Sequence, residues 1–415
     1  MTISFICLFG VLDFYKQYIK YFKEELIMGR KIQLLRGDKI NLPILDIAEM
    51  ALCTDTHEPF IGSNIGNIQL AKEADRLSDK ADNATNVKAF GATGDGITND
   101  TVAIQSAINA SSIVYFPPGT YLCSGIVLPS NFKLLGAGIG ATTLKLIPIP
   151  TSPLIDISGV TGNCKENISI SDITLMHNTT FVRNGFAGVL LVGQYTRRIL
   201  IENVEFKTFN AHAIYVRYTD DSTTMAQGWI IRGCIFRDGG TASTGIFLDS
   251  ESEYNLVSNC TFHTITYAIK VTNAANNTIL ECIFLNCAGI TADVSLANCG
   301  KLTVMGCLIN HCTGYGIVIN QSIVTKGEYG SIISGNEILY SPGALYLNGV
   351  IGVIVTGNRL INNSGSPITL KDNGAIVSDY NIINNNMSIV ATLLNNTSTG
   401  THNVITNNLE SVPNT

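Results

Sequence analysis

The chain has 415 residues, of which 46% are apolar and only 14% are charged, and its net charge is −6. This apolar fraction argues against wholesale disorder, and the acidic balance without a Lys/Arg run argues against a nucleic-acid binder. No apolar run reaches the ~18 residues of a transmembrane helix, so we expect neither nucleic acid nor membrane as a partner.

The N-terminal segment 1–27 lacks a basic region and a small-residue cleavage site, so it does not resemble a secretory signal. Residues 23–27 can be encoded by a purine-rich sequence similar to a bacterial ribosome-binding site directly before Met28. We therefore expect residues 1–27 to be a non-native extension. N-terminal sequencing of the native product should then begin at Met28.

The next two segments differ in composition. Residues 28–70 contain apolar runs divided by the turn residues Pro59, Gly62 and Gly66, which predicts a small β-rich attachment module. Residues 71–85 are charged and helix-favouring, with sparse apolar residues. This pattern predicts a linker or a thin neck helix rather than a core helix.

Asp100 precedes the apolar-periodic run TVAIQSAIN. An acidic residue in this place predicts an N-cap and a short amphipathic helix over 101–109. Two β-rich pieces follow, separated by Pro117, Pro118 and Gly119.

From about residue 165 the sequence repeats a pattern of apolar strand, Gly/Asn pair, second strand, turn and Gly/Ala-led strand. Alignment at steps of 22–29 residues places in one column Cys234, Cys260, Cys282, Cys307, Asn336, Asn358, Asn386 and Asn408. Repeats of this kind predict one β-solenoid of nine to eleven coils over 145–410. A linear file of thiols does not converge on a metal ion, so we interpret these cysteines as small buried apolar residues. The asparagines should hydrogen-bond along the stack.

The segment VKAFGATGDGITNDTVAIQSAIN, followed by VYFPPGTYL, resembles the opening of the pectate-lyase-like, right-handed parallel β-helix superfamily. It is similar to rhamnogalacturonase/epimerase-like lyase domains and to phage tailspike and appendage depolymerases. The resemblance implies an all-β fold, a single-stranded right-handed parallel β-helix over 86–415 with the helix plugging its N-terminal end. It also implies structural roles for Asp95, Gly96 and Asp100. The module at 28–70 resembles N-terminal modules of tail appendages from phages of Gram-positive hosts.

The Gly/Ala-led strands provide two outward columns, because alternation turns their aliphatic residues inward. The first column is Leu190, Tyr215, Phe247, Lys270, Thr291, Val318, Tyr346 and Thr369. The second is Val192, Arg217, Asp249, Thr272, Asp293, Asn320, Asn348 and Lys371. Aromatic and ionisable residues concentrate over three neighbouring coils, which we interpret as a substrate groove. The alternatives are an oligomer interface and a plain surface with an Arg217–Asp249 ion pair.

The candidate catalytic residues are Asp249, Glu251, Asp293 and Arg217, and the candidate substrate-binding residues are Tyr215, Phe247, Lys270 and His212. Tyr215 and Phe247 should offer flat faces to sugar rings. Asp249 should lie about 9.6 Å from Asp293 and, along an extended strand, about 6.6 Å from Glu251. Either separation suits the two carboxylates of an inverting glycosidase. A lyase instead needs one base and a cation that neutralises a uronate carboxylate, for which Arg217 and Lys270 are candidates.

We expect no cofactor and no metal. Calcium held by Asp249, Glu251 and Asp293 is a minor alternative, since no calcium-loop motif is present. The remaining histidines are expected at the surface: His177, His263, His311 and His402.

The resemblance implies a phage or prophage tail appendage that binds and cleaves a bacterial surface polysaccharide or teichoic acid, as a lyase or a hydrolase. The polygalacturonase set of N-T-D, D-D, H-G and R-I-K is absent, and Asp220-Asp221 alone does not supply it. The alternatives are a non-catalytic glycan-binding adhesin or structural tail protein, and an exported pectin-type lyase. The expected partners are the phage tail or baseplate, through the N-terminal module, and two further copies in a homotrimer. The expected location is extracellular, on the virion.

Overall fold

The computed structural model describes residues 84–410 except 149, 179–187, 218–226, 295–300, 322–329, 362, 375 and 390–392, and the backbone of four strands between 35 and 69. The chain divides into two compact units, Met1–Asp82 and Asn83–Thr415. The predicted extension 1–27, most of the predicted linker 71–85, and Asp220-Asp221 lie outside the described residues.

The first unit contains a four-stranded sheet in the order β1 (Leu35–Gly37), β2 (Met50–Cys53), β3 (Pro59–Ser63), β4 (Gly66–Gln69). The first pair of strands is parallel, and the two following pairs are antiparallel. The β-rich character predicted for this segment is confirmed.

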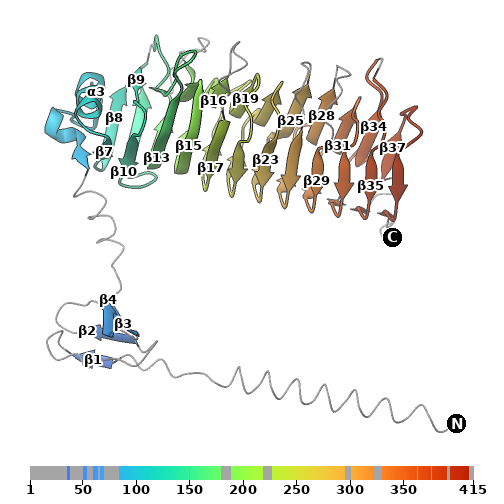
Figure 1. Cartoon of the computed structure of the whole chain (residues 1–415), viewed down its shortest axis with the longest axis horizontal. Helices are drawn as coiled ribbons and strands as arrows, with labels where there is room; N and C mark the ends of the chain where they lie inside the picture. The colour runs from blue at the N-terminus through green and yellow to red at the C-terminus, as the bar shows by residue number, and fades with distance from the viewer. Residues whose placement is uncertain are drawn as a thin grey trace, which may run out of the picture. The chain divides into compact units, whose positions relative to one another are not determined.

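The second unit is a parallel β-solenoid of about 11 turns (Figure 1). Each turn adds one strand to an 11-stranded sheet: β9 (Ile126–Val127), β12 (Ile155–Asp156), β14 (Leu191–Gln194), β16 (His212–Arg217), β19 (Thr244–Asp249), β22 (Tyr267–Thr272), β25 (Ala288–Val294), β28 (Tyr315–Gln321), β31 (Gly343–Asn348), β34 (Ile368–Lys371) and β37 (Leu394–Asn396). The number of turns agrees with the prediction. The first turn begins near residue 113, earlier than the predicted 145.

The rest of each turn lies in a 24-stranded sheet. Its strands up to residue 237 are β5 (Thr85–Asn86), β6 (Asp95–Asn99), β7 (Ile113–Phe116), β8 (Gly119–Cys123), β10 (Lys133–Gly136), β11 (Thr142–Leu146), β13 (Lys165–Met176), β15 (Thr196–Lys207), β17 (Gln227–Arg232) and β18 (Ile235–Arg237). The later strands are β20 (Leu256–Ser258), β21 (Thr261–His263), β23 (Asn277–Leu280), β24 (Ile283–Leu285), β26 (Leu302–Met305), β27 (Leu308–Asn310), β29 (Ile332–Ser334), β30 (Glu337–Leu339), β32 (Ile354–Thr356), β33 (Arg359–Ile361), β35 (Ile382–Asn384), β36 (Met387–Ser388), β38 (Val404–Thr406) and β39 (Leu409–Glu410).

Helix α3 (Thr101–Ala110) covers one end of the solenoid (Figure 1), as predicted, with Ile104, Ala107 and Ile108 buried. It follows a short 3-10 helix, η2 (Val87–Phe90). Asp100 stands at the N-cap, but its side chain does not cap the helix. Its carboxylate instead accepts hydrogen bonds from Thr93 and from the backbone of Gly94. No helix among the described residues is long and apolar enough to cross a membrane.

A left-handed residue turns the chain between the two short strands of each coil. Its φ is positive at Asp172, Asn203, Gly233, Asn259, Glu281, Gly306, Gly335, Gly357, Asn385 and Asn407. Glycine and asparagine tolerate this conformation best, which explains the repeated Gly/Asn pair in the sequence.

The residue after this turn is buried in each of these coils up to Asn386, and is half-buried at Asn408 in the last one; here the predicted column is confirmed. Cys234, Cys260, Cys282 and Cys307 are at most 1% exposed. The asparagines that continue the file hydrogen-bond from coil to coil, as Asn336 Nδ2 donates to Asn358 Oδ1 (2.9 Å) and Asn358 Nδ2 to Asn386 Oδ1 (2.9 Å). A parallel stack of rings, Phe206, Phe236, Phe262 and Phe284, fills the interior beside it, with centroids 4.6–5.0 Å apart.

Candidate functional site

The strand register confirms both outward columns from Tyr215 and Arg217 onward. The first coil of the alignment was wrong by two residues. Val192, and not Leu190, lies opposite Tyr215, and Gln194 lies opposite Arg217. Leu190 is fully buried and precedes strand β14, which begins only at Leu191.

Five of the predicted site residues contact one another on the outer face of β16, β19 and β22. The ring of Tyr215 stacks on that of Phe247 at 5.1 Å, and His212 lies 5.2 Å from Tyr215 and 5.0 Å from Phe247. Lys270 places its Nζ 5.4 Å from the centre of the Phe247 ring. The Tyr215 hydroxyl donates a 2.8 Å hydrogen bond to Asp249 Oδ2. We call His212, Tyr215, Phe247, Asp249 and Lys270 the Tyr215 cluster.

Tyr215 does not present a free face for sugar stacking, contrary to the expectation. It is only 7% exposed, because Val189 and Val192 pack beside it and Phe247 covers it from the next coil. Burial, reinforced by the hydrogen bond to Asp249, raises the pKa of Tyr215 well above its usual value. The phenol therefore stays protonated and acts as a hydrogen-bond donor to the carboxylate.

Asp249 lies between Arg217 and Thr272 in the second column, as predicted. Its Oδ1 accepts a second, longer hydrogen bond of 3.2 Å from Ser250 Oγ. The ion pairs formed among the described residues do not include Arg217 with Asp249, so a surface ion pair does not explain these two side chains. Arg217 Nε is buried with no hydrogen-bond partner among the described residues.

Glu251 does not extend the strand beyond Asp249, as the predicted separation assumed. Strand β19 ends at Asp249, and both Ser250 and Glu251 have positive φ, at 39° and 54°. The chain therefore turns at this point. Asp293 lies two strands from Asp249, in the predicted register, and its Oδ1 accepts a hydrogen bond from Asn320 Nδ2 at 2.8 Å.

Across the described residues, no three His, Cys, Asp or Glu side chains come together as ligands for a metal ion. Asp249, Glu251 and Asp293 therefore do not form the calcium site considered from the sequence. The expectation of surface histidines was wrong for His177, which is fully buried. Burial lowers the pKa of His177 to about 4.

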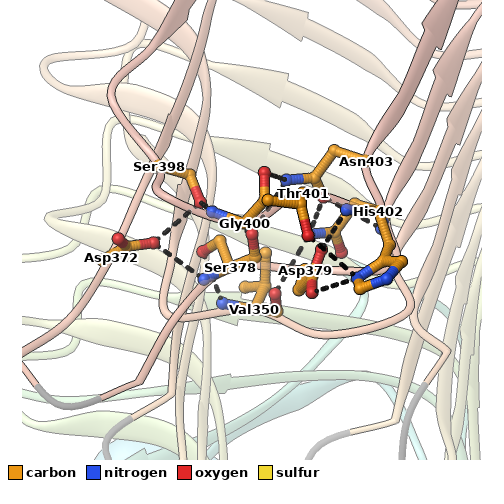
Figure 2. Close-up of polar contacts among 10 residues, drawn as sticks. Val350, Asp372, Ser378, Asp379, Ser398, Gly400, Thr401, His402 and Asn403 are labelled. Atoms are coloured by element: carbon orange, nitrogen blue, oxygen red, sulfur yellow. Dashed lines mark hydrogen bonds and ion pairs between the residues drawn. The ribbon is translucent and has the colours of Figure 1, made fainter.

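A dense polar network at the C-terminal end of the solenoid was not selected from the sequence (Figure 2). Asp372 accepts four hydrogen bonds of 2.7–2.9 Å, from the Ser378 and Thr399 backbone and from the Ser398 and Thr399 hydroxyls. Asp379 accepts two, from His402 N and Nδ1 at 2.7 and 2.8 Å. Partial desolvation raises the pKa of Asp372, but its hydrogen bonds outweigh this and bring it to about 2. The turn-rich stretches LKDNG and TSTGTHN are the signal that indicates such a network.

Comparisons with known proteins agree with this architecture. Residues 290–412 match a family described as a right handed beta helix region. The A-module of a mannuronan C-5 epimerase from Azotobacter vinelandii has the same fold, with a TM-score of 0.63 at 17% identity over 79% of this chain and 100% of that module.

Two curated relatives match over part of the chain. A mannuronan C5-epimerase of Azotobacter vinelandii is 27% identical over 47% of this chain and 21% of its own length. The pre-neck appendage protein of Bacillus phage B103 is 34% identical over 43% of this chain and 22% of its own length. The chain thus spans about a fifth of the length of these relatives.

Residues 84–293, half of the chain, match the family described as rhamnogalacturonase A/epimerase, pectate lyase-like. This stretch contains the capping helix, the first turns of the solenoid and the whole Tyr215 cluster. The chain belongs to the rhamnogalacturonase A/epimerase, pectate lyase-like family.

Proposed function

We propose that this protein is a phage or prophage tail appendage that binds and cleaves an acidic bacterial surface polysaccharide or a teichoic acid. The family, the epimerase relative and the phage pre-neck appendage relative support a carbohydrate-active protein of this kind. The observation that carries the proposal is the hydrogen-bonded Tyr215–Asp249 pair beside the Lys270 ammonium on the outer face of the sheet.

This arrangement suits β-elimination better than hydrolysis. The neighbours of Asp249 in its column are a cation and a hydroxyl, Arg217 and Thr272, so a second carboxylate does not stand next to it. Proton abstraction beside a uronate carboxylate needs one base and positive charge to stabilise the developing negative charge. Asp249 would take the proton, and Lys270 and Arg217 would neutralise the carboxylate of the sugar.

The other members of the cluster then have distinct tasks. Tyr215 stays protonated and holds Asp249 Oδ2 in place, which fixes the orientation of the base. As the C–O bond to the next sugar breaks and a C=C bond forms, the departing oxygen needs a proton. We assign this donation to His212, whose ring lies against Tyr215 and Phe247.

The test is a product assay on purified host-wall polymers. A lyase produces unsaturated ends that absorb in the ultraviolet, whereas a hydrolase produces reducing ends without this absorbance. We expect Asp249→Asn to lower the rate roughly 10²–10⁴-fold, the usual contribution of general acid–base catalysis. The variant should keep its fold, since an asparagine oxygen can still accept the Tyr215 hydrogen bond.

Asp293→Asn is the matched control, because it removes a carboxylate from the same column two coils away. It should keep its activity if the reaction is an elimination, and lose it if Asp249 and Asp293 are the two carboxylates of a hydrolase. An Asp249→Asn protein that folds normally and retains full activity would refute the assignment of the base.

The proposed function also includes an assembly on the virion. We infer that the module at 28–70 attaches the protein to the tail or baseplate, and that three copies form a homotrimer on the virion. Light scattering should then report three times the 44.6 kDa chain mass. A single-chain mass at micromolar concentration would contradict the trimer.

A further inference from the structure

A second group of aromatic and cationic side chains lies farther along the same face. The rings of Tyr315 on β28 and Tyr346 on β31 are 5.0 Å apart, and Lys371 on β34 places its Nζ 5.5 Å from the centre of the Tyr346 ring. Tyr346 belongs to the same outward column as Tyr215 and Phe247. We call Tyr315, Tyr346, Asn348 and Lys371 the Tyr346 cluster.

The cation of this cluster has Tyr346 rather than a carboxylate as its partner, and a buried acceptor opposite it lacks a donor in the described part of the chain. Lys371 takes part in none of the ion pairs formed among the described residues. Asn348, directly opposite Lys371, has a buried Oδ1 with no hydrogen-bond partner in the described part of the chain. Its Nδ2 is engaged, since it donates to Asn320 Oδ1 at 3.3 Å. A buried acceptor without a donor is costly, so the place suits a ligand hydroxyl.

The spacing of the two clusters fits one extended ligand. Phe247 and Tyr346 are four strands apart in the sheet, through Lys270, Thr291 and Val318. At about 4.8 Å per strand this amounts to about 19 Å along the solenoid axis, the span of several sugar units. Thr291 and Val318, which separate the clusters in this column, are small uncharged side chains.

We propose that the Tyr346 cluster is a second subsite for an anionic sugar polymer that lies along the solenoid axis. A sugar ring packs against Tyr346 and Tyr315, its carboxylate or phosphate pairs with the Lys371 ammonium, and a hydroxyl donates to Asn348 Oδ1. The inference rests on the proposed function, because the same polymer would continue to the Tyr215 cluster. It goes beyond the epimerase-related stretch, which ends at residue 293.

The structural alternative is a cation–π contact that only stabilises the fold. Such a contact contributes about 0.5–1 kcal/mol at an exposed site. It needs no unsatisfied acceptor opposite the lysine, and Asn348 Oδ1 is one. Ligand binding accounts for this acceptor and for a lysine without a carboxylate partner together.

The test measures binding of three polymers by calorimetry: polymannuronate, which carries carboxylates, glycerol-phosphate teichoic acid, which carries phosphates, and neutral dextran. We expect wild-type protein to bind at least one of the anionic polymers and not dextran. Lys371→Gln should weaken that binding about tenfold, as expected for the loss of a hydrogen bond to a charged group at a partly solvated site. Whichever anionic polymer shows the loss identifies the charged group of the ligand.

Two controls keep the result specific. Lys133→Gln removes an exposed lysine from β10, on the other sheet, and should leave binding unchanged. Tyr346→Leu keeps an apolar side chain at the cluster and should also weaken binding, with melting behaviour checked for both cluster variants. Equal affinity of Lys371→Gln and Lys133→Gln for both anionic polymers would overturn the proposal, as would the absence of wild-type binding to either.

Chain length separates this proposal from the proposed function. Lys371→Gln should weaken the binding of long oligomers that span both clusters. It should weaken the binding of disaccharides much less where these occupy the Tyr215 cluster alone. If Asp249→Asn stays fully active while Lys371→Gln weakens binding, the catalytic assignment fails and the second subsite stands. If Asp249→Asn loses activity while Lys371→Gln binds long oligomers normally, the second subsite fails and the catalytic assignment stands.

Discussion

Removing one asparagine from the buried file should destabilise the solenoid far more than removing one from its surface. Asn358 is 1% exposed, and its Oδ1 accepts hydrogen bonds from Asn336 N and Asn336 Nδ2 at 3.0 and 2.9 Å. Asn358→Ala leaves these two buried donors without an acceptor. Each such group costs about 1–3 kcal/mol, so we expect a loss of about 2–6 kcal/mol.

Urea unfolding measures the total effect, and hydrogen exchange of peptides covering β29 and β30 locates it. The Asn336 amide should lose protection, because its acceptor is Asn358 Oδ1. Asn395→Ala on β37 is the matched control, since Asn395 is exposed and its loss should change stability by no more than about 0.5 kcal/mol. An Asn358→Ala protein as stable as Asn395→Ala would refute the reasoning.

Three further predictions concern the site, the packing around Trp229 and the C-terminal end of the solenoid. Tyr215→Phe removes the donor to Asp249 and should lower kcat about tenfold or more with KM unchanged; a raised KM alone would mean that Tyr215 only binds substrate. Gly193→Ala places a Cβ 2.3 Å from Trp229 Cζ2 and should cost about 1–3 kcal/mol by thermal unfolding; an unchanged Tm would contradict this clash. Asp372 has a folded-state pKa of about 2, below its unfolded value, so its stabilisation is present above about pH 4 and is lost as pH falls towards 2. Urea unfolding of Asp372→Asn should differ from wild type near pH 5 and converge with it near pH 2, and a difference that does not vary with pH would count against this role.

The repeat was readable from the sequence because three separate signals return in every coil. The left-handed turn is mostly Gly or Asn, the next residue is a buried Cys or Asn from Cys234 to Asn386, and the outward strand alternates. Once two such columns are aligned, the register of all later coils follows. The alignment failed only in its first coil, where the stretch led by Gly188 was matched two residues too early and Val192 was assigned to the wrong column.

The site was less predictable, because alternation shows which residues point outward and not which neighbours cover them. Tyr215 points outward, yet Val189 and Val192 bury it. Its hydrogen bond to Asp249 joins two neighbouring coils and the two outward columns. The sequence pattern within one coil therefore cannot predict it. Glu251 was placed on an extended strand because the sequence does not mark where β19 ends.

The file of thiols determines when the chain is vulnerable to oxidation. Contact with the preceding thiol, together with burial, raises the pKa of Cys260, Cys282 and Cys307 in the folded protein, so little reactive thiolate forms. An unfolded chain exposes all of these thiols, so in an oxidant it can join cysteines that belong to different coils. Folding therefore has to precede exposure to oxidants. A reducing cell interior suits synthesis of the chain, and burial in the folded solenoid then protects the thiols in an oxidising environment.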